Sequence, residues 1–126
     1  MFWAGRIEDA LRVRKLADRR NVGVSFNFAH LPAVKDEPNL DQCLRDALPY
    51  LELVSINGAE HEGGWDRLIQ PLDRGAFDVF GFLKKLTAAG YKGPIGLQCY
   101  QVPGDIEDNL RRSMAVWRGF TVRMGR

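Results

Sequence analysis

The sequence predicts an α/β fold in which short parallel strands alternate with helices. Three stretches, Val22–Phe28, Leu53–Asn57 and Ile95–Tyr100, alternate large apolar residues with small or polar ones. This alternation is expected for strands with one buried face. Helical patterns precede the first stretch and follow each of the three. Strands that alternate with helices favour right-handed crossovers, so the order is predicted to be α-βα-βα-βα around a parallel sheet.

Composition sets the broad class of the protein. The length of 126 residues suits one ordinary domain, and the contents of 45% hydrophobic and 27% charged residues are typical of soluble globular proteins. A net charge of +2 is too small to favour nucleic acid or a membrane surface as a partner, and no apolar run approaches a transmembrane span. Cys43 and Cys99 have no metal-binding or redox spacing, so two buried free thiols and a cytoplasmic location are predicted.

The first half of the chain contains two predicted helices. An apolar stripe over Ile7–Arg19 predicts the first helix, although no capping residue precedes it. Leu31–Pro38, with its two prolines, is predicted to be a loop. Asn39 is predicted to cap the next helix, with Gln42 as the reciprocal partner of a capping box, and Pro49 sets the end of this helix.

The second half contains one long loop and two further helices. Gly58–Gly75 is polar and long, and a loop of this length within a compact unit is usually functional. Asp78 is predicted to cap a helix that stops at Gly90, and Asp105 is predicted to cap the last helix. Thr121–Arg126 is predicted to be an irregular tail.

An amide side chain stands at or near the end of each predicted strand, on the face away from the helices. These amides are Asn27, Asn57 and Gln98. In a barrel of parallel strands the active-site groups lie at the carboxyl ends of the strands, so we expect the three amides to converge on one cavity. Amides both donate and accept hydrogen bonds, which suits a polyol ligand. The alternative is that each amide satisfies backbone groups of its own loop.

Four segments together carry a resemblance to a known family, and a Pro-Leu-x-x-Gly-x-x-Asp segment followed by a helix and Gly-Tyr-x-Gly-Pro is its most specific part. The segments are Val22–His30, Val54–Gly58, Gln70–Asp78 and Gly90–Gln98. They resemble the C-terminal half of a sugar phosphate isomerase/epimerase of the xylose-isomerase-like TIM-barrel superfamily. The resemblance covers roughly residues 7–118.

The resemblance implies a partial (β/α)8 barrel. Residues 1–126 would form a single C-terminal half-barrel, the last three βα units with one preceding helix. Complete barrels of this kind take about 250 residues. A three-stranded piece has two open edges, which can pair with other chains. We therefore expect a truncated gene product, or a half-barrel that self-associates to cover its edges.

The resemblance also implies a metal site for Mg²⁺ or Mn²⁺, which members of the superfamily hold with two Glu, an Asp and a His. The Asp-x-x-His motif of the family corresponds to Asn27 and His30, the strand-seven His to Ser55, and the strand-eight Glu to Gln98. His30 is thus the implied metal ligand, and His30, Asn27 and Gln98 are the implied catalytic positions. The two amides remove two negative charges from the family's site, and an amide cannot act as a general base. His30 is alternatively a loop histidine packed under Pro32.

The long loop supplies the remaining candidates for substrate binding. Trp65 and Arg67 are predicted to close over a sugar ring, and Arg74 is predicted to contact a phosphate or carboxylate. The alternative for Arg74 is a solvent-exposed loop cation. Glu60 and His61 lack the spacing of metal ligands, so they are assigned to a solvated loop.

Three functions remain open from the sequence. The first is a sugar or sugar-phosphate isomerase/epimerase, with a small-molecule sugar or sugar phosphate as partner and neither nucleic acid nor membrane. The second is a non-catalytic carbohydrate-binding remnant, favoured by the amides at carboxylate positions. The third is a metal-dependent endonuclease, which is the weakest because the chain has only 2 histidines and no basic stripe.

Overall fold

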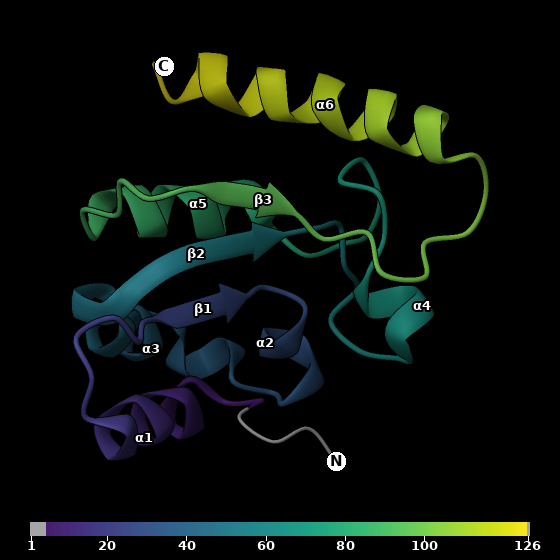
Figure 1. The fold of residues 1–126 in the computed structure, drawn as a ribbon. Coiled ribbons are helices and arrows are strands. Elements are labelled where there is room, and N and C mark those ends of the chain that lie inside the picture. Colours follow the sequence, from purple (N-terminus) through teal and green to yellow (C-terminus); the bar gives the residue numbers. More distant parts are fainter. Residues whose placement is uncertain (1–4, 126) are drawn as a thin grey trace.

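The computed structural model describes residues 5–125 and contains a three-stranded parallel sheet (Figure 1). The strands are β1 (Val24–Asn27), β2 (Leu51–Ile56) and β3 (Ile95–Leu97), in the order β1-β2-β3. Both strand pairs are parallel, and helices connect them. The predicted α/β class and the order of elements are confirmed.

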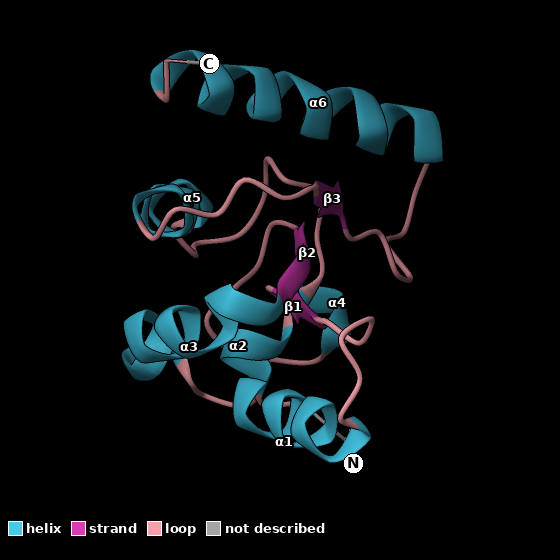
Figure 2. Cartoon of the chain, turned by 60° about the vertical axis from the view of Figure 1, so that its left-hand side comes forward, coloured by secondary structure: helices cyan, strands magenta, loops and turns pink. Residues whose placement is uncertain are grey.

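Four longer helices surround the sheet: α1 (Ile7–Ala17), α3 (Leu40–Ala47), α5 (Val79–Ala88) and α6 (Ile106–Arg123). Figure 2 shows α3 and α5 on one side of the strands. In Figure 1, α1 lies beyond the β1 edge and α6 beyond the β3 edge. The result is an arc of strands with helices outside it. The shorter helical segments are α2 (His30–Ala33), η1 (Glu37–Asn39), η2 (Leu48–Tyr50) and α4 (Trp65–Leu68).

The hydrophobic core lies between the strands and the helices that cover them. The Phe82 ring of α5 has its centroid 5.6 Å from that of Phe26 and 5.0 Å from that of Phe28. Val54 at the centre of β2 is fully buried. On the opposite face of the same strand, Leu53 is 41% exposed. The alternation in the sequence therefore identifies the buried face correctly.

Two of the three predicted helix caps are confirmed. Asp78 Oδ1 accepts a hydrogen bond from Gly81 N at 2.8 Å, and Asp105 Oδ1 accepts one from Asp108 N at 2.8 Å. The predicted capping box at Asn39 is wrong, because the side chain of Asn39 makes no capping hydrogen bond. The turn η1 runs directly into α3, so the carbonyl of Glu37 already accepts the N–H at the start of the helix.

Several predicted boundaries differ from the structure. β2 begins at Leu51, two residues earlier than predicted, whereas β3 ends at Leu97 because the chain then turns. The predicted loop over Leu31–Pro38 contains the end of α2 and the start of η1. The predicted tail from Thr121 is helical to Arg123, since α6 continues through it.

The two cysteines occupy different environments. Cys43 is buried, and burial raises the pKa of its thiol. Cys99 is exposed, so its predicted burial is wrong. It lies two residues beyond the end of β3, where the chain has left the sheet. None of the helices within residues 5–125 has the length and apolar character of a transmembrane span.

Candidate functional site

Asn27 ends β1 and shapes the turn that follows. Its Oδ1 accepts a hydrogen bond from Ala29 N at 3.2 Å, which holds the backbone as it enters α2. The side chain is half-buried, and within residues 5–125 its Nδ2 has no hydrogen-bond partner. Asn27 Oδ1 is therefore used within the turn, whereas Nδ2 is available to donate a hydrogen bond to a ligand.

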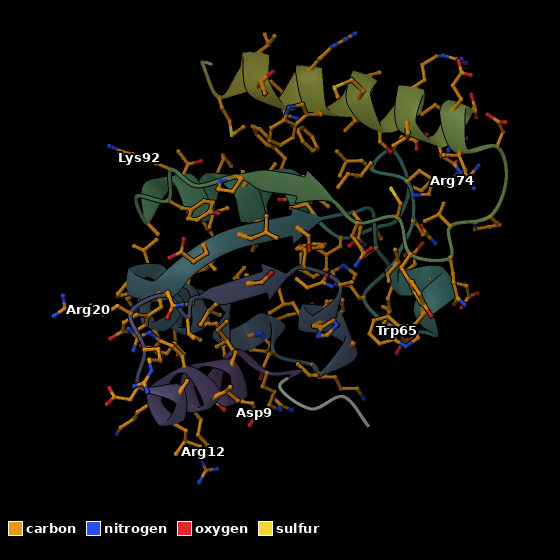
Figure 3. The ribbon with its side chains drawn as sticks, in the orientation of Figure 1. Asp9, Arg12, Arg20, Trp65, Arg74 and Lys92 are labelled. Carbon is orange, nitrogen blue, oxygen red and sulfur yellow. The ribbon has the colours of Figure 1, made fainter. Side chains whose placement is uncertain are left out.

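His30 and Trp65 come together at the same end of the sheet. His30 is the first residue of α2, and Trp65 is the first residue of α4 in the long loop. Their ring centroids are 5.6 Å apart, with the planes tilted by 47°. Figure 3 shows Trp65 on the side to which the strand arrows point. We call Asn27, His30 and Trp65 the strand-end site.

Two hollows meet at His30, which contributes to the walls of both. The first has a volume of about 220 Å³ and is also lined by Asn27 and Asp36. The second has a volume of about 360 Å³ and is lined by Trp65 and Lys35 as well as His30. The imidazole is thus within reach of a molecule in either hollow.

An ion pair that the sequence does not reveal closes one side of the first hollow. Arg6 Nη1 donates to the carboxylate of Asp36, and Arg6 Nη2 donates to Val34 O at 2.9 Å. Asp36 is only 6% exposed, so the guanidinium compensates a buried charge. The pair fixes the segment before α1 against α2. No local pattern predicts it, because the two residues lie in separate segments of the sequence.

Asn57 is buried and stabilises the long loop. Its Nδ2 donates to Gly58 O and to Leu68 O, both at 2.7 Å, and its side chain has no exposed surface. Leu68 ends α4, the helix that begins at Trp65. Asn57 therefore positions the loop that carries Trp65. The expectation that the Asn57 amide faces a ligand is wrong, because the side chain is buried and bonded to the loop backbone.

Gln98 repeats the local geometry of Asn27 but lies elsewhere. Its Oε1 accepts a hydrogen bond from Tyr100 N at 3.0 Å. In the sheet register Asn27 pairs with Ser55, which pairs with Gly96, so β1 and β3 are two strand spacings apart, about 10 Å. Gln98 lines a small hollow beside α6 that contains no residue of the strand-end site. The expected convergence of the amides on one cavity is not found.

Arg67 and Arg74 are both exposed and lie apart from each other. Arg67 Nη2 is 3.9 Å from Glu60 Oε1, so it has an acidic neighbour within the loop. Figure 3 shows Arg74 near the start of α6, away from Trp65. His61 Nδ1 is 3.1 Å from Glu37 Oε2, a contact between the exposed loop and η1. Of the predicted loop residues, only Trp65 joins the strand-end site.

The far end of the long loop is attached to α6. Arg112 binds Asp73 through two hydrogen bonds of 2.9 and 3.0 Å. This hydrogen bonding is the main reason that the pKa of Asp73 lies below its usual value.

Gly75 has a φ of +90°, and a Cβ there would lie 2.2 Å from Ala59 O, so the loop requires glycine at this position. The beginning of the loop at Ala59 and its end at Gly75 therefore lie directly against each other.

The residues present do not fit the divalent-cation site that the family resemblance implies. Within the described part of the chain, no three His, Cys, Asp or Glu side chains are grouped in a way that could hold a metal ion. Asn27 and Gln98 offer neutral oxygens, which hard cations favour less than carboxylates, and they line different hollows. We therefore derive no chemical step through a metal from this chain.

The parallel sheet and its outer helices define part of an α/β barrel. The family model described as Xylose isomerase-like TIM barrel matches residues 1–120. The chain belongs to this xylose isomerase-like TIM barrel family. Comparison with curated proteins gives no match.

Two solved structures share the fold. A 3-keto-D-glucoside 4-epimerase from E. coli is 24% identical with a TM-score of 0.73, and the match covers 94% of this chain and 41% of that one. A xylose isomerase domain protein from Planctomyces limnophilus is 18% identical with a TM-score of 0.70, and the match covers 94% of this chain and 42% of that one. The chain thus spans about two fifths of the length of these structures, which agrees with a partial barrel.

Proposed function

We propose that this chain contributes a sugar-binding part of an isomerase or epimerase of the xylose isomerase-like family. The grouping of Asn27, His30 and Trp65 around two hollows at the carboxyl end of β1 carries this proposal. Aromatic rings pack against the apolar faces of sugars, and amides and imidazoles bind their hydroxyl groups. The ligand class is a small sugar or sugar phosphate, in line with the epimerase named among the structural neighbours.

Each residue of the strand-end site has a distinct role. Asn27 Nδ2 donates to a sugar hydroxyl while its Oδ1 remains on Ala29 N. His30 lines both hollows, and its imidazole is placed to form a hydrogen bond with a hydroxyl group of a bound sugar. Trp65 covers one face of the ring. The amides of Asn27 and Gln98 cannot remove a proton from carbon. We therefore assign sugar binding to this chain, and we do not assign to it the metal-assisted proton transfer of the family.

The test is a sugar titration of the ¹⁵N-labelled chain, followed by NMR with and without Mg²⁺. We expect D-xylose, D-fructose or a 3-keto-glucoside to shift the Trp65 indole and Asn27 side-chain signals, with a Kd on the order of 1 mM. Asn27→Ala and His30→Gln should weaken binding several-fold. Asn21→Ala, which removes an exposed amide outside the site, is the matched control and should leave binding unchanged.

The same titration tests the assignment of sugar binding without metal chemistry. Equal binding with and without Mg²⁺ is the expected result, because Asn27 and Gln98 stand at carboxylate positions of the family, and it also fits the alternative of a carbohydrate-binding remnant. Binding that requires Mg²⁺, or formation of an isomerised product by this chain alone, would contradict the assignment. If no sugar shifts the Trp65 or Asn27 signals, the proposed site is wrong.

A further inference from the structure

We propose that the strand-end site binds a neutral glycoside, with the sugar in the first hollow and the attached second ring in the second hollow. This inference rests on the proposed function and narrows its ligand from a sugar or sugar phosphate to an uncharged sugar that carries a further ring. The two hollows are direct neighbours, because Gly5, His30 and Val34 line both of them. A ligand at His30 can therefore extend from one hollow into the other.

The sizes of the hollows favour a ligand made of two parts. Binding sites for small molecules usually have volumes of about 300–1,000 Å³. The first hollow, at about 220 Å³, lies below this range and suits a single sugar ring. The second hollow is larger, at about 360 Å³, and a single sugar bound beside Asn27 would leave most of it empty. A glycoside would fill both.

The first hollow offers the polar groups that a sugar needs. Asn27 Nδ2 is available as a donor, and the exposed Ser25 adds a hydroxyl group. The buried carboxylate of Asp36 accepts hydrogen bonds from Arg6 and, at 3.4 Å, from Asn39. Both of these contacts use Oδ1, so within residues 5–125 Oδ2 has no hydrogen-bond partner. The wall thus combines donors and acceptors, which matches the hydroxyl groups of a sugar.

The second hollow has a different lining, which suits the face of a ring. Its apolar wall is formed by Trp65 with the buried residues Pro32 and Leu68. Gly63 and Gly64 also line it, and glycine lets a ligand approach the backbone closely. Aromatic side chains such as Trp65 gain both buried area and ring-to-ring contact from a second ring. We therefore place the second ring of the glycoside here.

The charged groups of the hollows favour a neutral ligand over a sugar phosphate. Apart from His30, the ionisable groups of opposite charge in the first hollow are Arg6 and Asp36. The second hollow likewise has one base and one acid, Lys35 and Glu62. Phosphate is bound most strongly by cationic side chains, above all by Arg. A phosphate in either hollow would meet one carboxylate for each cation and so gain little net attraction.

The test compares matched ligands on the ¹⁵N-labelled full chain by NMR. Methyl β-D-xyloside and phenyl β-D-xyloside should both shift the Asn27 side-chain signals. Only the phenyl compound should also shift the backbone amides of Lys35 and Gly64, which line the second hollow alone, and its Kd should be about tenfold lower. D-fructose 6-phosphate should bind no more tightly than D-fructose.

The outcomes separate this proposal from the proposed function. Equal affinity for the two xylosides, or tighter binding of fructose 6-phosphate than of fructose, overturns the neutral glycoside while the sugar site stands. If none of these ligands shifts the Asn27 signals, the sugar site itself is wrong, and the glycoside is rejected with it.

A pair of substitutions tests the place of the second ring. Ala33 is the exposed last residue of α2 and lines only the second hollow, so Ala33→Trp should fill this hollow and remove the tenfold advantage of the phenyl xyloside. Ala88→Trp adds the same ring at the exposed last residue of α5, which lines neither hollow, and should leave the advantage intact. An advantage that persists in Ala33→Trp, or that Ala88→Trp also loses, contradicts the second hollow as the binding place.

Discussion

The two faces of the sheet differ in what they contribute to the protein. On the helix-covered face, Phe26, Phe28 and Val54 are 5% exposed or less. On the open face, Leu53 is 41% exposed, and Ser25 is also exposed. Both sets of residues come from the same strands. The comparison shows that one alternating pattern encodes a buried face that stabilises the fold and an open face whose side chains stay partly exposed.

Truncating a core ring should have the largest effect. Phe82→Ala removes contacts with Phe26 and Phe28 and leaves a cavity on the covered face, so the free energy of unfolding should fall by about 3–5 kcal/mol. Leu53→Ala on the open face should cost less than about 1 kcal/mol, because the side chain is partly hydrated already. Urea unfolding measures both. Equal losses would mean that the open face is buried in solution.

The sequence predicts the elements better than it predicts the site. Alternation identifies the strands and their covered face because burial acts locally on every second residue. The Asp78 and Asp105 caps are also predicted, since each bonds within its own helix turn. The strand-end site depends on distant segments that meet: Asn57 bonds to Leu68, and Arg6 pairs with Asp36.

The separation of Asn27 from Gln98 has a similar cause. Similar strand-end amides in sequence suggest one shared cavity, but the register places them across two strand spacings. Each oxygen also bonds to an N–H two residues ahead, a local interaction that competes with a ligand. A pattern in one sequence cannot show which of these interactions wins.

Loss of the buried amide that positions the long loop should have an intermediate effect. Asn57→Ala leaves the carbonyls of Gly58 and Leu68 buried without this donor, so we expect a loss of about 2 kcal/mol in the free energy of unfolding. Asn109→Ala is the matched control, because its amide donates to Pro103 O in an exposed position, and it should cost under about 1 kcal/mol. Trp65 signals in NMR should broaden or shift only in the first variant. Unchanged Trp65 signals in Asn57→Ala would separate the buried amide from the strand-end site.

The smallest effect is expected at the exposed attachment of the loop to α6. The Arg112 side chain lowers the pKa of Asp73, so the folded protein favours the ionised carboxylate. This contribution is complete above the ordinary Asp pKa of about 3.9 and is lost as the pH falls through the lower pKa of the folded state. Near neutral pH, Asp73→Asn should cost about 1 kcal/mol or less, because both side chains are partly exposed.

The pH dependence of stability distinguishes the loss of this ion pair from the overall destabilisation of the protein by acid. Wild type and Asp73→Asn should approach each other in stability as the pH is lowered below about 4, since protonation removes the same charge. Asp66→Asn is the control, because Asp66 is exposed and has no ion pair within residues 5–125. Thermal unfolding over an acidic pH series measures the difference. A constant gap between wild type and Asp73→Asn at every pH would show that the Arg112 contact does not depend on the charge of Asp73.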